Sequence, residues 1–110
     1  QRVRARPAAP GVAAGRIVPC QPHERLATSC ADAILLVDRP VPALAPLLFG
    51  ARGLIARTGA ASSHLAEVAR SLAVPMVTGC RLPAEGTARH PGSWLAAIDG
   101  TSGEVALLPG

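Results

Sequence analysis

The chain has 110 residues, of which 49% are hydrophobic and 2% aromatic, and its formal net charge is +4. This length fits one domain with its own core, and Pro, Gly or charged residues interrupt every apolar stretch well short of the roughly 20 residues that cross a bilayer. We therefore expect no membrane partner. We also expect no secretory signal, because the first residues lack a basic start followed by an apolar run and a cleavage site. Phe49 and Trp94 alone supply too few aromatic rings for base stacking, so we expect no nucleic acid partner.

The three cysteines, Cys20, Cys30 and Cys80, are odd in number and form no closely spaced pair. This pattern is typical of reduced thiols in a cytoplasmic protein. His23 and His90 lie among proline and polar residues, and no Cys/His pair has the spacing of metal ligands. We therefore assign both histidines to surface loops and expect no metal site.

The first ten residues are rich in Arg, Ala and Pro, so we expect a linker or a loosely held lead-in segment over 1–10 and one compact domain over 11–110. Residues 33–37 form a continuous apolar run between Asp32 and Asp38, which is typical of a strand buried on both faces. Shorter apolar segments predict further strands at 15–18, 53–56, 76–77, 94–98 and 104–108.

The main helix is predicted over 63–72, where Leu65, Val68 and Leu72 fall at positions i, i+3 and i+7 on one face. Three prolines between positions 40 and 46 leave room only for a short helix over 45–49. A turn-rich connection between the last two strands predicts a terminal β-hairpin. Short strands with one main helix indicate a mixed α and β domain, in which the loop before the helix carries the chemistry.

A loop of small residues leads to His64 at the start of this helix. The free N–H groups and the positive end of the helix dipole favour an anion such as phosphate there, and a neutral imidazole is a good nucleophile near neutral pH. Thr58, Gly59, Ser62 and Ser63 are near enough in sequence to donate hydrogen bonds to a phosphorylated imidazole. Residue types and spacing leave a second interpretation open, in which His64 is a solvated residue of the helix-capping region.

The segment 58–79, TGAASSHLAEVARSLAVPMVTG, resembles the signature of the phosphohistidine domain, also called the mobile or swivelling domain, of phosphoenolpyruvate-utilising enzymes. That signature is T-G-G-x-x-S-H-a-A-x-x-A-R, followed by P-x-v-x-G. The matching positions are Thr58, Gly59, Ser63, His64, Ala66, Ala69, Arg70, Pro75 and Gly79. Flanking segments at 10–15, 34–37 and 98–105 resemble the same family, and Pro42 with 46–48 resembles the P-x-x-x-P-L-L of its phosphoenolpyruvate synthase and rifampicin phosphotransferase branch. The resemblance therefore covers nearly the whole chain after Pro10.

The resemblance implies a swivelling β/β/α domain of the α/β class, in which His64 is the transiently phosphorylated nucleophile and Thr58, Gly59 and Ser63 form the phosphate-supporting loop. It also implies a phosphotransferase of which this domain is one part. The partners would be a nucleotide-binding, ATP-grasp-like domain and a domain for phosphoenolpyruvate, pyruvate or another acceptor. We expect ATP and Mg²⁺ on those partners, because this chain has no lysine and no G-x-x-x-x-G-K-[ST] loop.

Two departures from the signature are Ala60, in place of the second glycine, and Glu67, in place of an apolar residue. The Glu67 carboxylate, three residues after His64, would repel a phosphorylated imidazole unless Arg70 neutralises it, or it would orient the imidazole as a hydrogen-bond acceptor. Arg70 itself is rotated about 120° from His64 around the helix, so we expect it to fix the loop or meet a partner domain rather than contact phosphate. The alternative function is a degenerate, non-phosphorylated docking or regulatory module with the same fold.

Overall fold

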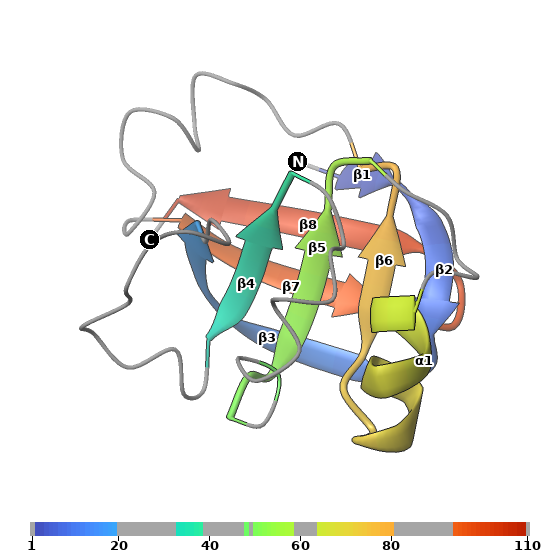
Figure 1. Cartoon of the computed structure of the whole chain (residues 1–110). Coiled ribbons are helices and arrows are strands. Elements are labelled where there is room, and N and C mark those ends of the chain that lie inside the picture. The colour runs from blue at the N-terminus through green and yellow to red at the C-terminus, as the bar shows by residue number, and fades with distance from the viewer. Residues whose placement is uncertain are drawn as a thin grey trace.

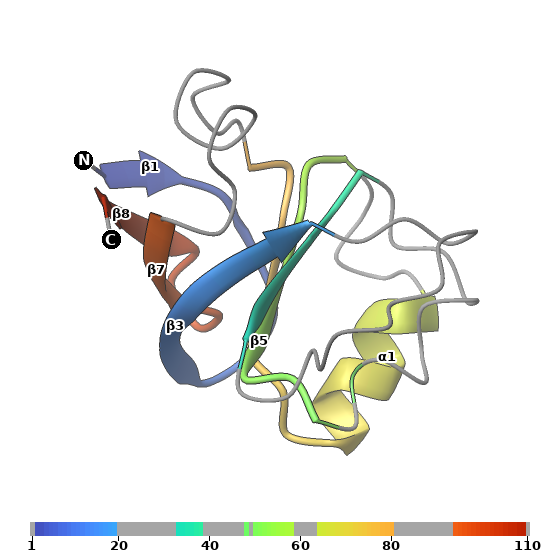
Figure 2. The same cartoon turned by 90° about the vertical axis from the view of Figure 1, so that its left-hand side faces the viewer.

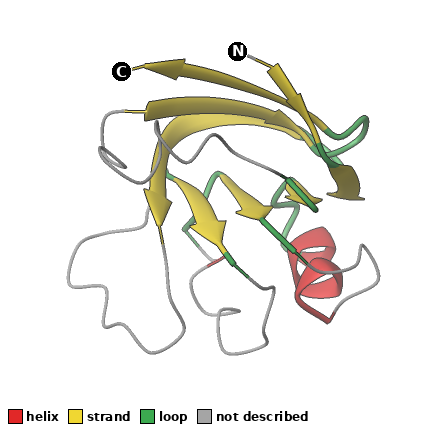
Figure 3. Cartoon of the chain, turned by 90° about the horizontal axis from the view of Figure 1, so that it is seen from above, coloured by secondary structure: helices red, strands yellow, loops and turns green. Residues whose placement is uncertain are grey.

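The structure is a computed structural model that describes residues 2–19, 33–38, 48, 50–58, 64–80 and 94–109. These residues form two β-sheets and one helix in three layers (Figure 2). Figure 3 shows the helix and the long strands of the outer sheet on opposite sides of the middle strands. The predicted α/β class and β/β/α layering are therefore confirmed.

The middle sheet contains the strands that lead to the helix. Strands β3 (Val12–Pro19), β4 (Ile34–Val37), β5 (Gly53–Ala56) and β6 (Met76–Thr78) run parallel to one another, and β2 (Arg6–Ala9) pairs antiparallel with β6 at the edge. The four parallel strands confirm the strands predicted from short apolar segments, with small changes at their ends.

The outer sheet is antiparallel and crosses behind the middle sheet (Figure 1). It contains β1 (Arg2–Arg4), β8 (Glu104–Pro109), β7 (Trp94–Asp99) and the first part of β3. Strand β3 joins the two sheets, because its residues 12–16 pair with β7 and its residues 17–19 pair with β4.

The residues of β4 alternate between two hydrophobic clusters. Leu35 and Val37 pack in the cluster beneath the helix, whereas Ile34 and Leu36 pack in the cluster between the two sheets. Side chains of successive strand residues point to opposite faces, so a strand covered on both faces needs an unbroken apolar run. The helix α1 (His64–Ser71) lies over the β6 and β2 end of the middle sheet (Figure 1).

The expectation of a linker or loosely held segment over 1–10 is wrong for residues 2–4 and 6–9, which form β1 and β2. Val3 packs against the cluster between the sheets, and Ala8 and Ala9 are buried beneath the helix. The arginines of β1 face solvent, so the segment alternates polar and apolar residues at the period of a strand. Its Arg, Ala and Pro content concealed this alternation, because alanine and proline have low strand propensity.

The hairpin turn between β7 and β8 is closed by the carboxylate of Asp99. Its Oδ1 accepts hydrogen bonds from the N–H groups of Thr101, at 2.9 Å, and Ser102, at 3.2 Å. These two backbone hydrogen bonds lower the pKa of Asp99 from its usual value. Gly103 ends the turn with φ of +89°, a conformation that favours glycine. The predicted terminal hairpin is confirmed.

The short helix predicted over 45–49 lies outside the described residues, apart from the buried Leu48. In the part of the chain that the structure describes, no helix has the length and apolar character needed to cross a membrane.

Candidate functional site

His64 is the first residue of α1, and its side chain is 66% exposed. The helix buries Leu65, Ala66 and Ala69 against the middle sheet, so its apolar stripe fixes its orientation and leaves His64 at the solvent-facing side. The helix ends before Pro75, where the N–H of Val74 bonds to the carbonyl oxygen of Ala69 at 2.9 Å. Helix and sheet together present an accessible imidazole at a helix N-terminus.

Thr58 begins the loop to His64 and is tied to the end of β4. Its backbone N–H and its Oγ1 both donate hydrogen bonds to the carbonyl oxygen of Asp38, at 3.0 and 2.7 Å. Arg57 adds an ion pair with the Asp38 carboxylate at 3.7 Å. The hydroxyl proton of Thr58 is thus used to anchor the loop to the neighbouring strand.

Gly59, Ala60, Ser62 and Ser63 lie outside the described residues. Their predicted role in supporting a phosphate therefore stays a prediction. The structure instead defines the two ends between which these residues run, namely Thr58 and His64.

The two predicted modulators, Glu67 and Arg70, contact different parts of the molecule. Oε2 of Glu67 is 3.9 Å from Nδ1 of His64, and both side chains are largely exposed. Nη1 of Arg70 donates a 2.7 Å hydrogen bond to the carbonyl oxygen of Ala8 in β2. Glu67 therefore lies beside the imidazole, whereas Arg70 attaches the helix to the sheet.

Two residues near this site were not among the site residues predicted from the sequence. Asp38 holds the start of the loop, and the signal was its place directly after β4, because the carboxyl ends of adjacent parallel strands lie together. Thr78 ends β6 with a fully buried side chain whose Oγ1 has no hydrogen-bond partner among the described residues. No pattern in the sequence distinguishes this threonine from an ordinary strand residue.

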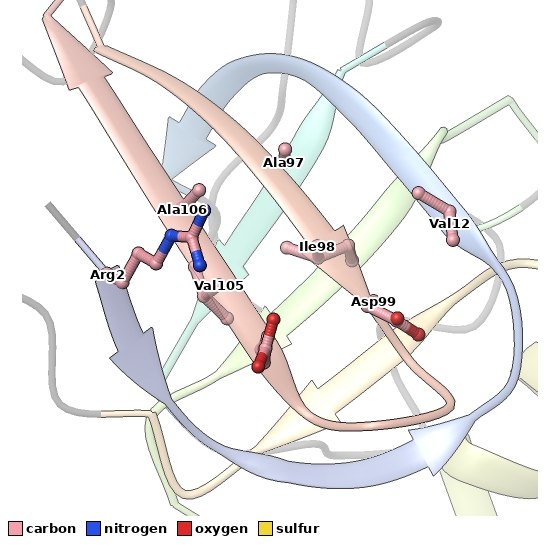
Figure 4. A pocket seen from close by; sticks show the side chains of 8 residues that line it. Arg2, Val12, Ala97, Ile98, Asp99, Val105 and Ala106 are labelled. Atoms are coloured by element: carbon pink, nitrogen blue, oxygen red, sulfur yellow. The ribbon is translucent and has the colours of Figure 1, made fainter.

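A cavity of about 160 Å³ lies on the outer sheet (Figure 4). Ala97 and Ala106 form its floor, with Val12, Arg2 and Asp99 around it. The helix and this cavity are on opposite sides of the molecule (Figure 2), so the cavity takes no part in chemistry at His64. Across the described segments, no three His, Cys, Asp or Glu residues are grouped so that they could hold a metal ion.

The chain matches the family described as PEP-utilising enzyme, mobile domain, over residues 30–103. It is 32% identical over 104 residues to phosphoenolpyruvate synthase of Aeropyrum pernix, an alignment that covers 94% of this chain and 12% of that protein. It is 30% identical over 98 residues to phosphoenolpyruvate synthase of Pyrococcus furiosus, covering 89% of this chain and 12% of that protein. The chain thus spans only 12% of the length of these curated relatives.

Solved structures show the same fold. The N-terminal domain of Enzyme 1 - Nitrogen is similar with a TM-score of 0.57 and 25% identity, over 74% of this chain and 33% of that chain. Aconitase X of Thermococcus kodakaraensis in its holo-form has a TM-score of 0.71 at 18% identity, over 98% of both chains, which shows the fold alone. Because the family match covers most of the sequence, including the Thr58 loop and α1, the chain belongs to the mobile-domain family of phosphoenolpyruvate-utilising enzymes.

Proposed function

We propose that this domain is a phosphoryl carrier in which His64 accepts a phosphoryl group from one partner domain and delivers it to another. The observation that supports this most directly is the exposed imidazole at the first residue of α1, inside the matched family segment. Exposure gives a donor access to the ring, and the positive end of the helix dipole at the start of α1 favours the transferred phosphate.

Each transfer is a substitution at phosphorus. A lone pair of an imidazole nitrogen forms the P–N bond while the bond from phosphorus to the donor oxygen breaks, and that oxygen keeps the electron pair. In the second transfer an acceptor oxygen bonds to phosphorus, and the electrons of the P–N bond return to the ring. His64 is the only residue of this domain that changes its covalent bonds in this scheme.

The donor and acceptor sites belong to partner domains in this proposal. The relatives are phosphoenolpyruvate synthases much longer than this chain, which supports the presence of further domains. In this proposal one of them is a nucleotide-binding, ATP-grasp-like domain with ATP and Mg²⁺, and another binds phosphoenolpyruvate or pyruvate. Cys80 is a free, buried thiol, which suits a cytoplasmic location for the reaction.

The test is phosphorylation of the chain by isolated partner domains with labelled ATP or phosphoenolpyruvate. We expect an acid-labile, alkali-stable adduct that is lost in His64→Ala. The matched controls are His23→Ala and His90→Ala, each of which removes a histidine outside the family signature and should keep the adduct. If partners that phosphorylate another mobile domain leave this one unlabelled, the proposal fails.

A second candidate function is a docking or regulatory module with the same fold and no phosphoryl transfer. The contact of the Glu67 carboxylate with His64 is the observation that favours it, because a negative charge there opposes a phosphate nearby. Restoring glycine at position 60 and an apolar residue at 67 separates the two functions. This second function requires labelling to begin only in the double variant Ala60→Gly/Glu67→Leu, and full labelling of the unaltered chain contradicts it.

A further inference from the structure

Glu67 approaches one particular atom of the imidazole. Its Oε2 lies 3.9 Å from Nδ1, and the two side chains are similarly exposed, at 66% for His64 and 65% for Glu67. Residues at i and i+3 share one face of a helix, so the pair is held by the backbone of α1 itself. An acidic residue in the first turn also interacts favourably with the helix dipole, but that interaction does not depend on where the imidazole lies.

We propose that Glu67 is a positioning residue for His64, which keeps a proton on Nδ1 and leaves the lone pair of Nε2 for phosphorus; this inference rests on the phosphoryl-carrier function. A neutral imidazole carries its proton on one nitrogen only, and the charge that faces each nitrogen influences which tautomer forms. At 3.9 Å the Glu67 carboxylate is too far from Nδ1 for a hydrogen bond, but its negative charge attracts the positive end of an N–H dipole, so it stabilises the tautomer in which the nearer nitrogen, Nδ1, bears the proton.

The same carboxylate acts again after phosphorylation. When Nε2 bonds to phosphorus and Nδ1 keeps its proton, the ring becomes a cation, and the Glu67 carboxylate lies beside that positive charge. The phosphoryl group is then on the other nitrogen of the ring, away from the carboxylate. When the P–N bond breaks, its electron pair returns to Nε2 and a neutral imidazole leaves. Glu67 therefore favours the protonated phosphohistidine, which is the form that gives up its phosphoryl group readily.

The first test measures the tautomer and needs no phosphate. Two-bond ¹H–¹⁵N correlation spectra of the unphosphorylated chain, recorded at a pH where the imidazole is neutral, report which nitrogen bears the proton. We expect Nδ1–H to predominate in the wild-type chain and its fraction to fall in Glu67→Leu. Glu104→Gln is the matched control, because it removes an exposed glutamate from the opposite layer. An unchanged tautomer ratio in Glu67→Leu would overturn the proposal.

The second test measures the lifetime of the phosphohistidine, made with phosphoramidate as a small-molecule phosphoryl donor. An exposed charge pair contributes modestly, so we expect hydrolysis to be about 2- to 5-fold slower in Glu67→Leu at neutral pH and restored towards wild type in Glu67→Asp. Equal rates in the wild-type chain and Glu67→Leu would contradict the role of Glu67. If both Glu67 effects appear but active partner domains do not label His64, the carrier function fails while the positioning role stands.

Discussion

Arg70 shows how one residue of a functional signature stabilises the fold. Its guanidinium donates to the carbonyl oxygen of Ala8, so it connects the helix that begins with His64 to the edge strand β2. The sequence separation from His64 predicted that Arg70 lies off the face of the histidine, and the contact with Ala8 agrees with that orientation. The signature arginine therefore holds the helix in place in this structure.

Replacing Arg70 with Gln should lower the free energy of unfolding by about 1 kcal/mol, because a charge-assisted and partly buried hydrogen bond is lost. Urea denaturation measures this change. Arg16→Gln is the control, since Arg16 is exposed in β3 and its side chain has no hydrogen-bond or ion-pair partner among the described residues. Equal stability of the two variants would show that the Ala8 contact contributes nothing.

Thr78 has a buried hydroxyl without a partner in the described structure. A buried hydroxyl without a hydrogen-bond partner is destabilising by about 1–3 kcal/mol relative to one that forms a hydrogen bond. Valine has nearly the same shape as threonine but lacks the hydroxyl. We expect Thr78→Val to raise the unfolding free energy by about 1 kcal/mol in urea denaturation. Thr101→Val is the matched control and should be destabilising, because Oγ1 of Thr101 accepts a 3.2 Å hydrogen bond from Gly11. A loss of stability in Thr78→Val would mean that the hydroxyl is satisfied in solution.

At the scale of elements, strands with two buried faces were easier to predict than edge strands. All four residues of β4 and all four residues of β5 are buried. A continuous apolar run in so short a segment is typical of a strand covered on both faces. Strand β1 buries only Val3 in part, and its arginines resemble a solvated tail. Its place is determined by pairing with β8, about 100 residues away, and such a contact leaves no local pattern.

The turn between β7 and β8 contacts the N-terminal strands closely. A Cβ at Gly100 would overlap the carbonyl oxygen of Ala9, and a Cβ at Gly103 would overlap that of Ala5. Both contacts are to backbone, which cannot rotate away as a side chain does. The hairpin turn therefore needs glycine because of its neighbours as well as its own conformation.

We expect Gly100→Ala and Gly103→Ala each to lower the free energy of unfolding by about 3 kcal/mol, the upper part of the range for overpacking. Thermal and urea unfolding measure this change. Ser102→Ala, in the same turn, should have a much smaller effect, because it removes one 3.3 Å hydrogen bond to the N–H of Glu104. Near-wild-type stability of both glycine variants would show that β1 and β2 move away from the turn.

At the scale of the whole molecule, the site is held by segments that are far apart in the sequence, namely the ends of β4 and β5, the helix α1 and the edge strand β2. The start of α1 and the exposure of His64 were predictable, because helix periodicity and the family signature fall in the same segment. The attachment of Thr58 to Asp38 and of Arg70 to Ala8 depends on which strands are neighbours. These contacts follow from the parallel order of β4 and β5 and from the position of β2, which local periodicity does not specify.

Among the described residues, the cluster between the two sheets contains one ionisable group, the thiol of Cys80. Burial raises the pKa of Cys80 from 9.0 to about 11, and the positive charge of Arg57 opposes this increase. In the unfolded chain the thiol ionises near its ordinary value. Between about pH 9 and pH 11 the thiol is therefore protonated in the folded state and ionised in the unfolded state. The free energy of unfolding falls as the pH rises through this range.

The chain contains neither lysine nor tyrosine, and the background variant Cys20→Ser/Cys30→Ser removes the other two thiols, so in that background, which is used for all of these measurements, the alkaline loss of stability should be assignable to Cys80. The stabilisation is fully present below pH 9, and the difference between the two pKa values corresponds to about 2–3 kcal/mol that is lost by pH 11. Urea denaturation at pH 8, 9, 10 and 11 measures the slope. Cys80→Ala should be less stable at pH 8, because it leaves a small cavity, yet nearly independent of pH over this range. An equally steep decline in Cys80→Ala would assign the slope to other groups and show that water reaches the thiol between the sheets.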